Sequence, residues 1–308
     1  MKSLRLVLRA FKVLPLVLLG GCSALQVVNS VSKIYTVDVK ENIAFGEDPK
    51  LKYDLYLPDT ASEEFDATPV IVFFYGGSWN RGDKSEYEFV GRRLASMGYI
   101  AAIPNYRLYP EVKYPAFLED GALSIAHLKK ELAKPEYKNR KPAQQFIMMG
   151  HSAGAYNAAM LALDPRWLES SGLTHQTSIQ GFIGLAGAYN IYPINDVEVR
   201  PVFDHPNYPP KSQPIDYTAK ASVPSLILTP ETDTLVSIER NSEALHTALK
   251  SAGNQTILQT IEGTDHVTIV GTLSPLLFFK GSTSKPIEKF VRTLHKAATD
   301  RTATASER

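Results

Sequence analysis

Apolar positions in this chain follow two different periods, one typical of strands and one typical of helices. Segments 33–39 (KIYTVDV) and 51–58 (LKYDLYLP) alternate apolar with polar residues, which predicts two early antiparallel strands. Farther along, continuous apolar runs predict strands that are buried on both faces, as in a parallel sheet. These predicted strands cover residues 68–74, 99–107, 144–150, 178–187, 223–230 and 254–263.

Segments with helical spacing separate these apolar runs. They cover residues 84–98, 115–134, 152–165, 237–253 and 274–298, the last of them broken at Gly281. Strands that alternate with helices predict an α/β fold class, with an open, mostly parallel central sheet and helices on both faces. Residues 187–220 interrupt the alternation. We interpret them as a lid or cap insert, because loops of such length are unusual in compact domains.

The first 21 residues have the pattern of a signal peptide, a basic start followed by an apolar stretch too short to span a bilayer well. The segment LGGC that ends at Cys22 resembles the bacterial lipobox, and Cys22 is the one cysteine of the chain. The resemblance implies acyl chains on Cys22 and a stable membrane anchor. Because Ser23 follows, it also implies the periplasmic face of the bacterial outer membrane. The alternative is a plain signal peptide over 1–21 with an incidental cysteine.

From Cys22 we predict a polar tether over 22–33, one folded domain over 34–297 and a disordered polar tail over 298–308. Lys and Arg total 33 against 32 Asp and Glu and are spread along the chain, which argues against nucleic acid as a partner. No cluster of His and Cys has the spacing of metal ligands, so we expect neither a metal nor a cofactor. Nothing in these patterns specifies an oligomeric state.

The segment GHSAG, residues 150–154, lies between a predicted strand and an alanine-rich helical segment. A G-x-S-x-G pattern at such a junction is typical of a nucleophile elbow. The turn is so sharp that the residues two before and two after the serine crowd together, and only glycine fits there. It lifts the serine hydroxyl above the sheet edge, and the helix N-terminus behind it favours developing negative charge. We therefore predict that Ser152 is a nucleophile.

A serine nucleophile needs a general base, and in this type of fold the acid and then the histidine follow the serine along the chain. Of the 7 histidines, His266 and His295 lie far enough toward the C-terminus. His266 follows the last predicted strand in a loop, whereas His295 lies on the final predicted helix. We therefore choose His266 as the base and interpret His295 as a surface residue.

The acid is expected on the loop that follows the strand at 223–230, where Asp233 lies. Its role would be to hold the imidazole tautomer and to stabilise the imidazolium. Glu231 is a weaker rival on the same loop. Asp265 is the chain neighbour of His266, and because adjacent residues rarely face each other, we interpret it as structural.

The segment YGGSW, residues 75–79, leaves the strand at 68–74 through two adjacent glycines. A tetrahedral oxyanion needs two or three backbone N–H donors, and glycines let the backbone approach a substrate carbonyl without a Cβ in the way. We predict one donor from this loop and another from Ala153, the residue after the serine. Trp79 either walls the substrate pocket or packs in the core.

Taken in order, YGGSW, NYRLYPEVKYPAFLED (105–120), GHSAG, Asp233 and His266 resemble the α/β-hydrolase superfamily. Within it they are most similar to the carboxylesterases near the hormone-sensitive-lipase and kynurenine-formamidase groups. The resemblance covers almost the whole chain after Cys22 and implies an α/β-hydrolase fold over 34–297. Tyr75 stands where these groups have a histidine that supports the loop, so we expect catalysis to persist without it.

The resemblance also assigns roles to further residues. It implies that the backbone N–H groups of Gly77, Ser78 and Ala153 form the oxyanion hole. It implies that Arg107 and Asp120 form a structural ion pair behind the site.

The motifs together predict a serine carboxylesterase that hydrolyses short-chain carboxylic esters through an acyl-enzyme. An arylformamidase or another amide hydrolase is one alternative, and a non-catalytic binding protein on a hydrolase scaffold is an alternative of another class. The prolines of the insert oppose the long amphipathic helix that commonly shields the acyl groove of a lipase. We therefore expect Trp79 and Tyr189 to border a small aromatic pocket that prefers acetyl to butyryl esters.

Overall fold

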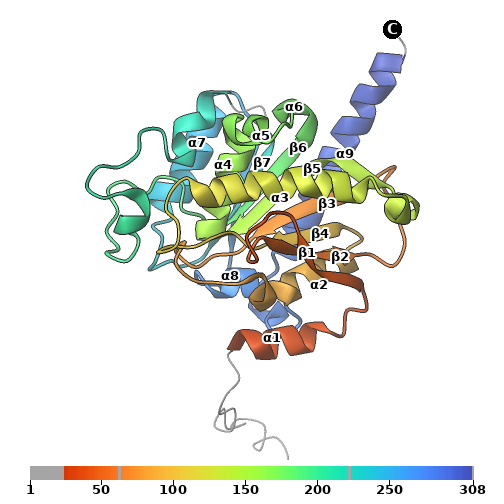
Figure 1. Ribbon diagram of the computed structural model, residues 1–308, viewed down its shortest axis with the longest axis horizontal. Helices are drawn as coiled ribbons and strands as arrows, with labels where there is room; N and C mark the ends of the chain where they lie inside the picture. Colours follow the sequence, from red (N-terminus) through yellow and green to blue (C-terminus); the bar gives the residue numbers. More distant parts are fainter. Residues whose placement is uncertain (1–23, 62–63, 221–222, 307–308) are drawn as a thin grey trace, which may run out of the picture.

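The computed structural model describes residues 24–61, 64–220 and 223–306. An eight-stranded sheet in the order β1-β2-β4-β3-β5-β6-β7-β8 runs through the molecule (Figure 1). Its strands are β1 (Asp38–Ala44), β2 (Lys52–Leu57), β3 (Thr68–Phe74), β4 (Ile100–Pro104), β5 (Pro142–His151), β6 (Ile179–Leu185), β7 (Ser225–Pro230) and β8 (Thr256–Ile261). The pairs β1–β2 and β2–β4 are antiparallel and the other pairs are parallel, so the predicted α/β class is confirmed.

Helices cover both faces of this sheet. The α-helices are α1 (Ala24–Ser32), α2 (Glu88–Ser96), α3 (Ala116–Leu132), α4 (Ala153–Leu163), α5 (Arg166–Ser170), α6 (His175–Ser178), α7 (Ala244–Ser251), α8 (Thr268–Gly271) and α9 (Ser284–Ser306). Shorter turns are the 3-10 helices η1 (Lys84–Tyr87), η2 (Pro135–Arg140), η3 (Arg200–Phe203), η4 (Pro214–Lys220) and η6 (Phe278–Lys280), and the π-helical η5 (Glu239–Glu243). Figure 1 shows α3 crossing in front of the sheet, whereas α9 begins behind it.

The sequences of the parallel strands are continuous apolar runs because helices cover both faces of the sheet. Every residue of β3 is buried, and so is β5 from Phe146 to His151. Since β3, β5, β7 and β8 are parallel, their carboxyl ends meet at one edge of the sheet, where α/β proteins place their ligands. The loops that follow these four strands carry all the residues we predicted to be catalytic.

The insert between β6 and β7 packs against the rest of the domain. Residues 187–220 contain η3 and η4 but no α-helix, as the prolines of this segment favour. Phe203 of the insert is fully buried and meets the ring of Trp79 edge-on, with 5.0 Å between the ring centroids. The hydroxyl of Tyr156 on α4 donates to the carbonyl oxygen of Ser212. The insert is therefore a packed cap over α4.

The interpretation of 22–33 as a tether is wrong for most of that segment, because Ala24–Ser32 forms α1. Asn29 fastens α1 to the domain: its Nδ2 donates to the carbonyl oxygen of Ser85 (2.7 Å), and its Oδ1 accepts from the N–H of Phe89 (3.0 Å). The N–H of Phe89 lies in the first turn of α2, where a helix has no internal acceptors. A cap supplied from so far along the chain leaves no local sequence signal.

The other end of the chain also differs from its prediction. Helix α9 continues to Ser306, so residues 298–306 of the predicted disordered tail are helical. Extending an existing helix costs far less than starting one, which favours such continuation. The first strand begins at Asp38 rather than at residue 33, and its register with β2 shifts between Lys40 and Ile43.

The predicted signal peptide (1–21) and Cys22 lie outside the described residues. Among the residues that are described, no helix is both long and apolar enough to cross a membrane.

The predicted ion pair between Arg107 and Asp120 is confirmed. Asp120 is 2% exposed, and its carboxylate accepts from the backbone N–H of Arg107 (2.9 Å) and from its Nη2 (2.7 Å). The pair fixes the loop after β4. That loop in turn holds the YGGSW segment, because the hydroxyl of Tyr106 donates to the carbonyl oxygen of Tyr75 (2.7 Å).

Replacing Arg107 by methionine is expected to destabilise the protein strongly, because it leaves the buried Asp120 carboxylate without its ion-pair partner. Loss of one partner of a buried pair costs about 3 kcal/mol. The matched control is Arg292→Met: the Arg292 side chain is 53% exposed where it pairs with Glu288, so its loss costs less than about 1 kcal/mol. Urea unfolding measures both variants, and equal losses would show that Arg107–Asp120 behaves as a surface pair.

Candidate active site

The GHSAG segment forms the sharp turn that its glycines predict. Ser152 lies between β5 and α4 with φ 54° and ψ −123°, a conformation that is strained for a residue with a Cβ. A Cβ on Gly154 would lie 2.1 Å from the carbonyl oxygen of Phe74, and one on Gly150 would lie 2.2 Å from that of Gly154. A larger residue at Gly154 would therefore push the turn away from β3, and one at Gly150 would open the turn itself.

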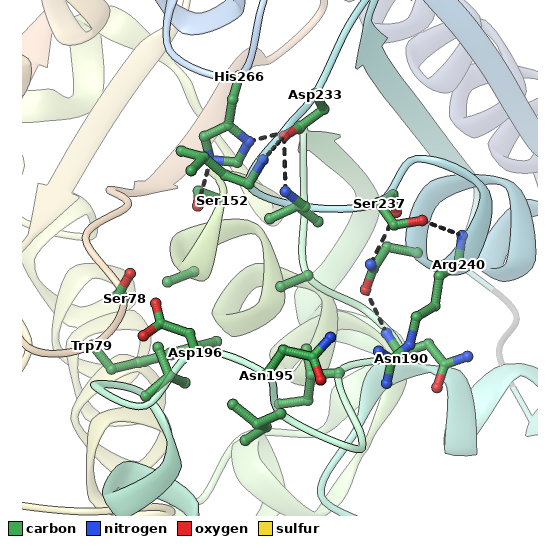
Figure 2. Close-up of a pocket in the computed structure, with 18 of the residues that line it drawn as sticks. Ser78, Trp79, Ser152, Asn190, Asn195, Asp196, Asp233, Ser237, Arg240 and His266 are labelled. Atoms are coloured by element: carbon green, nitrogen blue, oxygen red, sulfur yellow. Dashed lines mark hydrogen bonds and ion pairs between the residues drawn. The ribbon is translucent and has the colours of Figure 1, made fainter.

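Ser152, His266 and Asp233 lie in one chain of hydrogen bonds (Figure 2). His266 Nε2 is 2.9 Å from Ser152 Oγ, and His266 Nδ1 is 2.7 Å from Asp233 Oδ2. When Nδ1–H donates to the carboxylate, Nε2 carries a lone pair and accepts the hydroxyl proton of Ser152. The three residues follow β5, β7 and β8, and the parallel strand ends bring them together.

Asp233 receives several donors in addition to His266. Burial would raise the pKa of Asp233, but hydrogen bonds from His266 and from the backbone N–H groups of Val236 and Leu235 outweigh burial and hold this pKa below its usual value. The carboxylate is therefore ionised at neutral pH. It can stabilise a positive charge that develops on His266.

The rival residues make other contacts. Glu231 accepts from the backbone N–H of Gly263 (2.7 Å). Asp265 accepts from the N–H of Thr268 (2.8 Å), which closes a turn and fits its structural interpretation. His295 packs edge-on against Phe65, with 4.9 Å between the ring centroids. In the described part of the chain, no three His, Cys, Asp or Glu side chains gather in a way that would hold a metal ion.

The YGGSW segment reaches the same edge of the sheet from β3. Gly77, Ser78 and Trp79 have φ values of 130°, 53° and 57°, so this loop is tightly wound. Among the described residues, none accepts a hydrogen bond from the backbone N–H of Gly77, Ser78 or Ala153. These three N–H groups are the predicted oxyanion donors, and they are free to bind a ligand.

A stack of aromatic rings supports this loop at Tyr75, the position where the resemblance led us to expect a histidine. The ring of Tyr75 lies over that of Tyr106 at 4.7 Å and over that of Tyr87 at 5.7 Å between centroids. On the other side of the loop, Trp79 Nε1 donates to Asn157 Oδ1 on α4 (2.9 Å). The backbone of the loop is thus held from two sides. Dispersion and a buried hydrogen bond replace the support that a histidine side chain would give.

A cavity of about 450 Å³ opens beside Ser152 and His266. Trp79 borders this cavity and is also almost fully buried, so both interpretations of Trp79 hold in part. The wall away from Ser152 is mixed: Asn190, Asn195, Asp196, Ser237 and Arg240 are polar (Figure 2), and the apolar Ile191, Pro193, Ile194 and Val199 also line the cavity.

The placement of Tyr189 in the pocket is wrong. Its side chain is fully buried, and its ring meets that of Phe182 on β6 edge-on at 6.0 Å between centroids. The Tyr189 hydroxyl occupies the space that a side chain on Gly184 would fill, since a Cβ on Gly184 would lie 1.8 Å from the hydroxyl oxygen. The glycine that makes this room lies on the preceding strand, and no pattern in the sequence connects the two residues.

His151 is the site residue whose contacts the sequence did not predict. Its ring is buried, and its Nε2 donates to the carbonyl oxygen of His266 (2.7 Å). Its Nδ1 is buried without a partner among the described residues. Burial, with a smaller contribution from His266, lowers the pKa of His151 to about 3. The ring is therefore neutral, and Nε2 carries its proton. The variable position of a G-x-S-x-G pattern carries no signal for such a contact.

Solved structures define the fold class. The chain superposes with a TM-score of 0.68 on a truncated carbohydrate esterase from gut microbiota, at 18% identity over 84% of this chain and 96% of that one. It superposes at 0.66 on an inhibited esterase B from Lactobacillus rhamnosis, at 16% identity over 91% and 95%. The protein has the α/β-hydrolase fold, as predicted.

The family follows from the sequence. The BD-FAE profile matches residues 53–249, and the chain belongs to this family. It is 28% identical over 279 residues to a probable isoprenylcysteine alpha-carbonyl methylesterase of Oryza sativa subsp. japonica, covering 85% of this chain but 65% of the relative. It is 25% identical over 243 residues to the kynurenine formamidase of Danio rerio, covering 75% and 76%. The chain thus spans slightly less than two thirds of the rice protein.

Acidification is expected to destabilise the wild-type protein more steeply than the His151→Gln variant. In the unfolded chain His151 gains a proton as the pH falls through its ordinary pKa of 6.5, whereas in the folded protein it stays neutral down to about pH 3. The unfolded state binds more protons in this window, so stability present above pH 6.5 is lost as the pH falls, by up to about 1.4 kcal/mol per pH unit.

Urea unfolding from neutral pH down to about pH 4.5 measures the difference between the two proteins. His266 and Asp233, the titratable groups that act on His151, are present in both, so the difference isolates residue 151. Parallel curves for wild type and variant would contradict the prediction.

Proposed function

We propose that the protein is a serine carboxylesterase that hydrolyses short-chain carboxylic esters. The observation that carries this proposal is the chain of hydrogen bonds through Ser152, His266 and Asp233, with unpaired backbone N–H groups beside it. Relatives and structural neighbours that are named as esterases support the reaction class. The substrate is a small-molecule ester.

The reaction would proceed in two half-reactions. Ser152 Oγ attacks the ester carbonyl carbon while His266 Nε2 takes the hydroxyl proton, and the carbonyl oxygen becomes an oxyanion that the backbone N–H groups of Gly77, Ser78 and Ala153 bind. His266 then gives the proton to the leaving alcohol, and the acyl group stays on Ser152. Water attacks the acyl-enzyme with His266 again as base, and the carboxylic acid leaves.

Ser152→Ala is expected to lower kcat for p-nitrophenyl acetate by about 10⁴-fold or more, because members of a triad act as a unit. The variant keeps its fold, because the substitution removes one hydroxyl group. A fluorophosphonate probe should label Ser152 in the wild type and nothing in the variant, as read by peptide mass spectrometry. Labelling of another serine, or near-normal turnover by the variant, would refute the proposal.

The proposed preference for short acyl chains rests on the cavity walls. The insert packs onto Trp79 through Phe203, and on the far wall the polar Asn190, Asp196 and Arg240 interrupt the apolar lining. Each buried methylene contributes about 0.8 kcal/mol, so binding stops improving once the apolar part of the cavity is filled. A charged wall also penalises a longer chain, since desolvated polar groups would lose their partners.

A series of p-nitrophenyl esters from two to sixteen carbons tests this preference. We expect kcat/KM to be highest from acetyl to butyryl and to fall beyond roughly six carbons, with no jump in rate when the substrate forms an emulsion. A maximum at ten carbons or more, or activation at the lipid interface, would identify a lipase.

Amide hydrolysis is a second candidate, because the relatives include kynurenine formamidases that match 75% of this chain. The same acyl-transfer chemistry applies to a formamide, with an amine as the leaving group. N-formyl-kynurenine assayed beside p-nitrophenyl butyrate on one preparation decides between them. A higher kcat/KM for the formamide would replace the esterase proposal.

We also propose that acyl chains on Cys22 anchor the protein at the periplasmic face of the bacterial outer membrane. The segment LGGC supports this proposal. Because α1 begins at Ala24 and packs against the domain through Asn29, the described fold begins two residues after Cys22. An anchor there would hold the domain close to the membrane.

Cys22→Ala is expected to move the protein from the membrane fraction to the soluble fraction or to leave the precursor uncleaved. Intact mass spectrometry of the wild type should show a mature protein that begins at Cys22 and carries acyl chains. Mature protein without acyl chains would disprove the anchor.

A further inference from the structure

The loop that carries His266 is joined mainly to the loop of Asp233. The backbone N–H groups of Glu231 and Thr232 both donate to the carbonyl oxygen of Thr264 (3.1 and 3.3 Å). The acid and the base are therefore held in register with each other. These bonds do not hold either residue in register with Ser152, which belongs to the turn after β5.

His151 supplies the connection to that turn. Among the hydrogen bonds of the described residues, the bond from His151 Nε2 to the carbonyl oxygen of His266 is the one that joins the backbone of the base loop to the GHSAG turn. The other bond between the two segments is the reacting pair itself, Ser152 Oγ and His266 Nε2. Val267, the next residue, is 62% exposed, so packing by apolar side chains resumes only at the buried Ile269 of α8.

The ring of His151 also reaches the YGGSW segment. A Cβ on Gly76 would lie 3.1 Å from His151 Nδ1, so the second edge of the imidazole faces the first glycine of that loop. Nδ1 has no hydrogen-bond partner among the described residues, and a buried unpaired acceptor costs free energy. An apolar side chain would avoid this cost. The imidazole therefore lowers the stability of the fold, but it provides an Nε2–H donor at a fixed distance from the carbonyl oxygen of His266.

We propose that His151 is a positioning residue for the reaction: its Nε2–H, bound to the carbonyl oxygen of His266, holds the general base at reacting distance from Ser152. This inference rests on the proposed hydrolytic function. Without the bond, the base loop still keeps its contacts with the loop of Asp233 but shifts relative to the serine. A misplacement of about 1 Å can cost about 10²-fold in rate, so the effect falls on kcat.

Three variants at this position test the proposal. A Gln side chain can place an amide N–H close to the position of the His151 Nε2–H. Leu has no hydrogen-bond donor. Asn has the same amide as Gln, but its side chain is one methylene shorter. We expect His151→Gln to keep kcat for p-nitrophenyl butyrate within about threefold of the wild type, and His151→Leu and His151→Asn to lose about 10- to 100-fold. KM should change less than about twofold, because His151 does not touch the substrate.

His175→Leu is the matched control for buried structure. His175 is buried to the same extent as His151, and its Nε2 likewise lies 2.7 Å from a backbone carbonyl oxygen, that of Ala162 at the far end of α4. Its loss removes a buried hydrogen bond of the same kind and should leave kcat unchanged, whatever its effect on the melting temperature. The rate at which a fluorophosphonate labels Ser152, measured well below each melting temperature, gives a second readout of the serine–histidine contact.

The outcomes separate this inference from the proposed function. A wild type that neither turns over esters nor reacts with the probe would refute the proposed function itself. An active wild type with an equally active His151→Leu, a His151→Gln as slow as His151→Leu, or a loss that appears in KM alone would overturn the positioning role. An equal loss of kcat in His175→Leu would show that general destabilisation is the cause. If His151→Leu does not fold, the Asn and Gln variants decide.

Discussion

The close approach of the turn after β5 to the end of β3 constrains the whole site. Gly154 lies so near the carbonyl oxygens of Phe74 and Tyr75 that a Cβ would overlap both. This contact forces Ser152 into its strained conformation, with φ 54°, and brings the YGGSW loop beside it. One packing contact therefore sets both the height of the hydroxyl and its distance from the free N–H groups. The strain is sustained because β3 and β5 are buried neighbours in the sheet.

Support for this arrangement comes from layers of side chains that do not touch the cavity. The pair Arg107–Asp120 fixes the loop after β4, and Tyr106 of that loop both stacks on Tyr75 and donates to its carbonyl oxygen. These contacts hold the backbone of the YGGSW loop with a tyrosine at position 75.

The insert links the site to substrate choice. It contacts α4 through Tyr156 and the YGGSW loop through Trp79, and its first residues are fixed by Asn241, whose Oδ1 accepts from the N–H groups of Tyr189 and Asn190 (2.8 and 2.9 Å). A segment held at so many points forms a fixed wall rather than a flap. That wall presents both polar and apolar residues to the cavity beside Ser152.

The sequence by itself determined the alternation of strands with helices along the chain and the loops that carry Ser152, Asp233 and His266, but not the order of the strands within the sheet. These features depend on local patterns: apolar runs buried on two faces, glycines that a sharp turn requires, and loops that follow parallel strands. Tertiary structure alone decided that Tyr189 fills the space over Gly184 rather than the cavity, and that Asn29 caps α2 and turns the expected tether into a helix. It also decided that His151 reaches the carbonyl oxygen of His266. Each of these three contacts joins a side chain to an atom whose position depends on packing, and no periodicity or spacing along the chain records it.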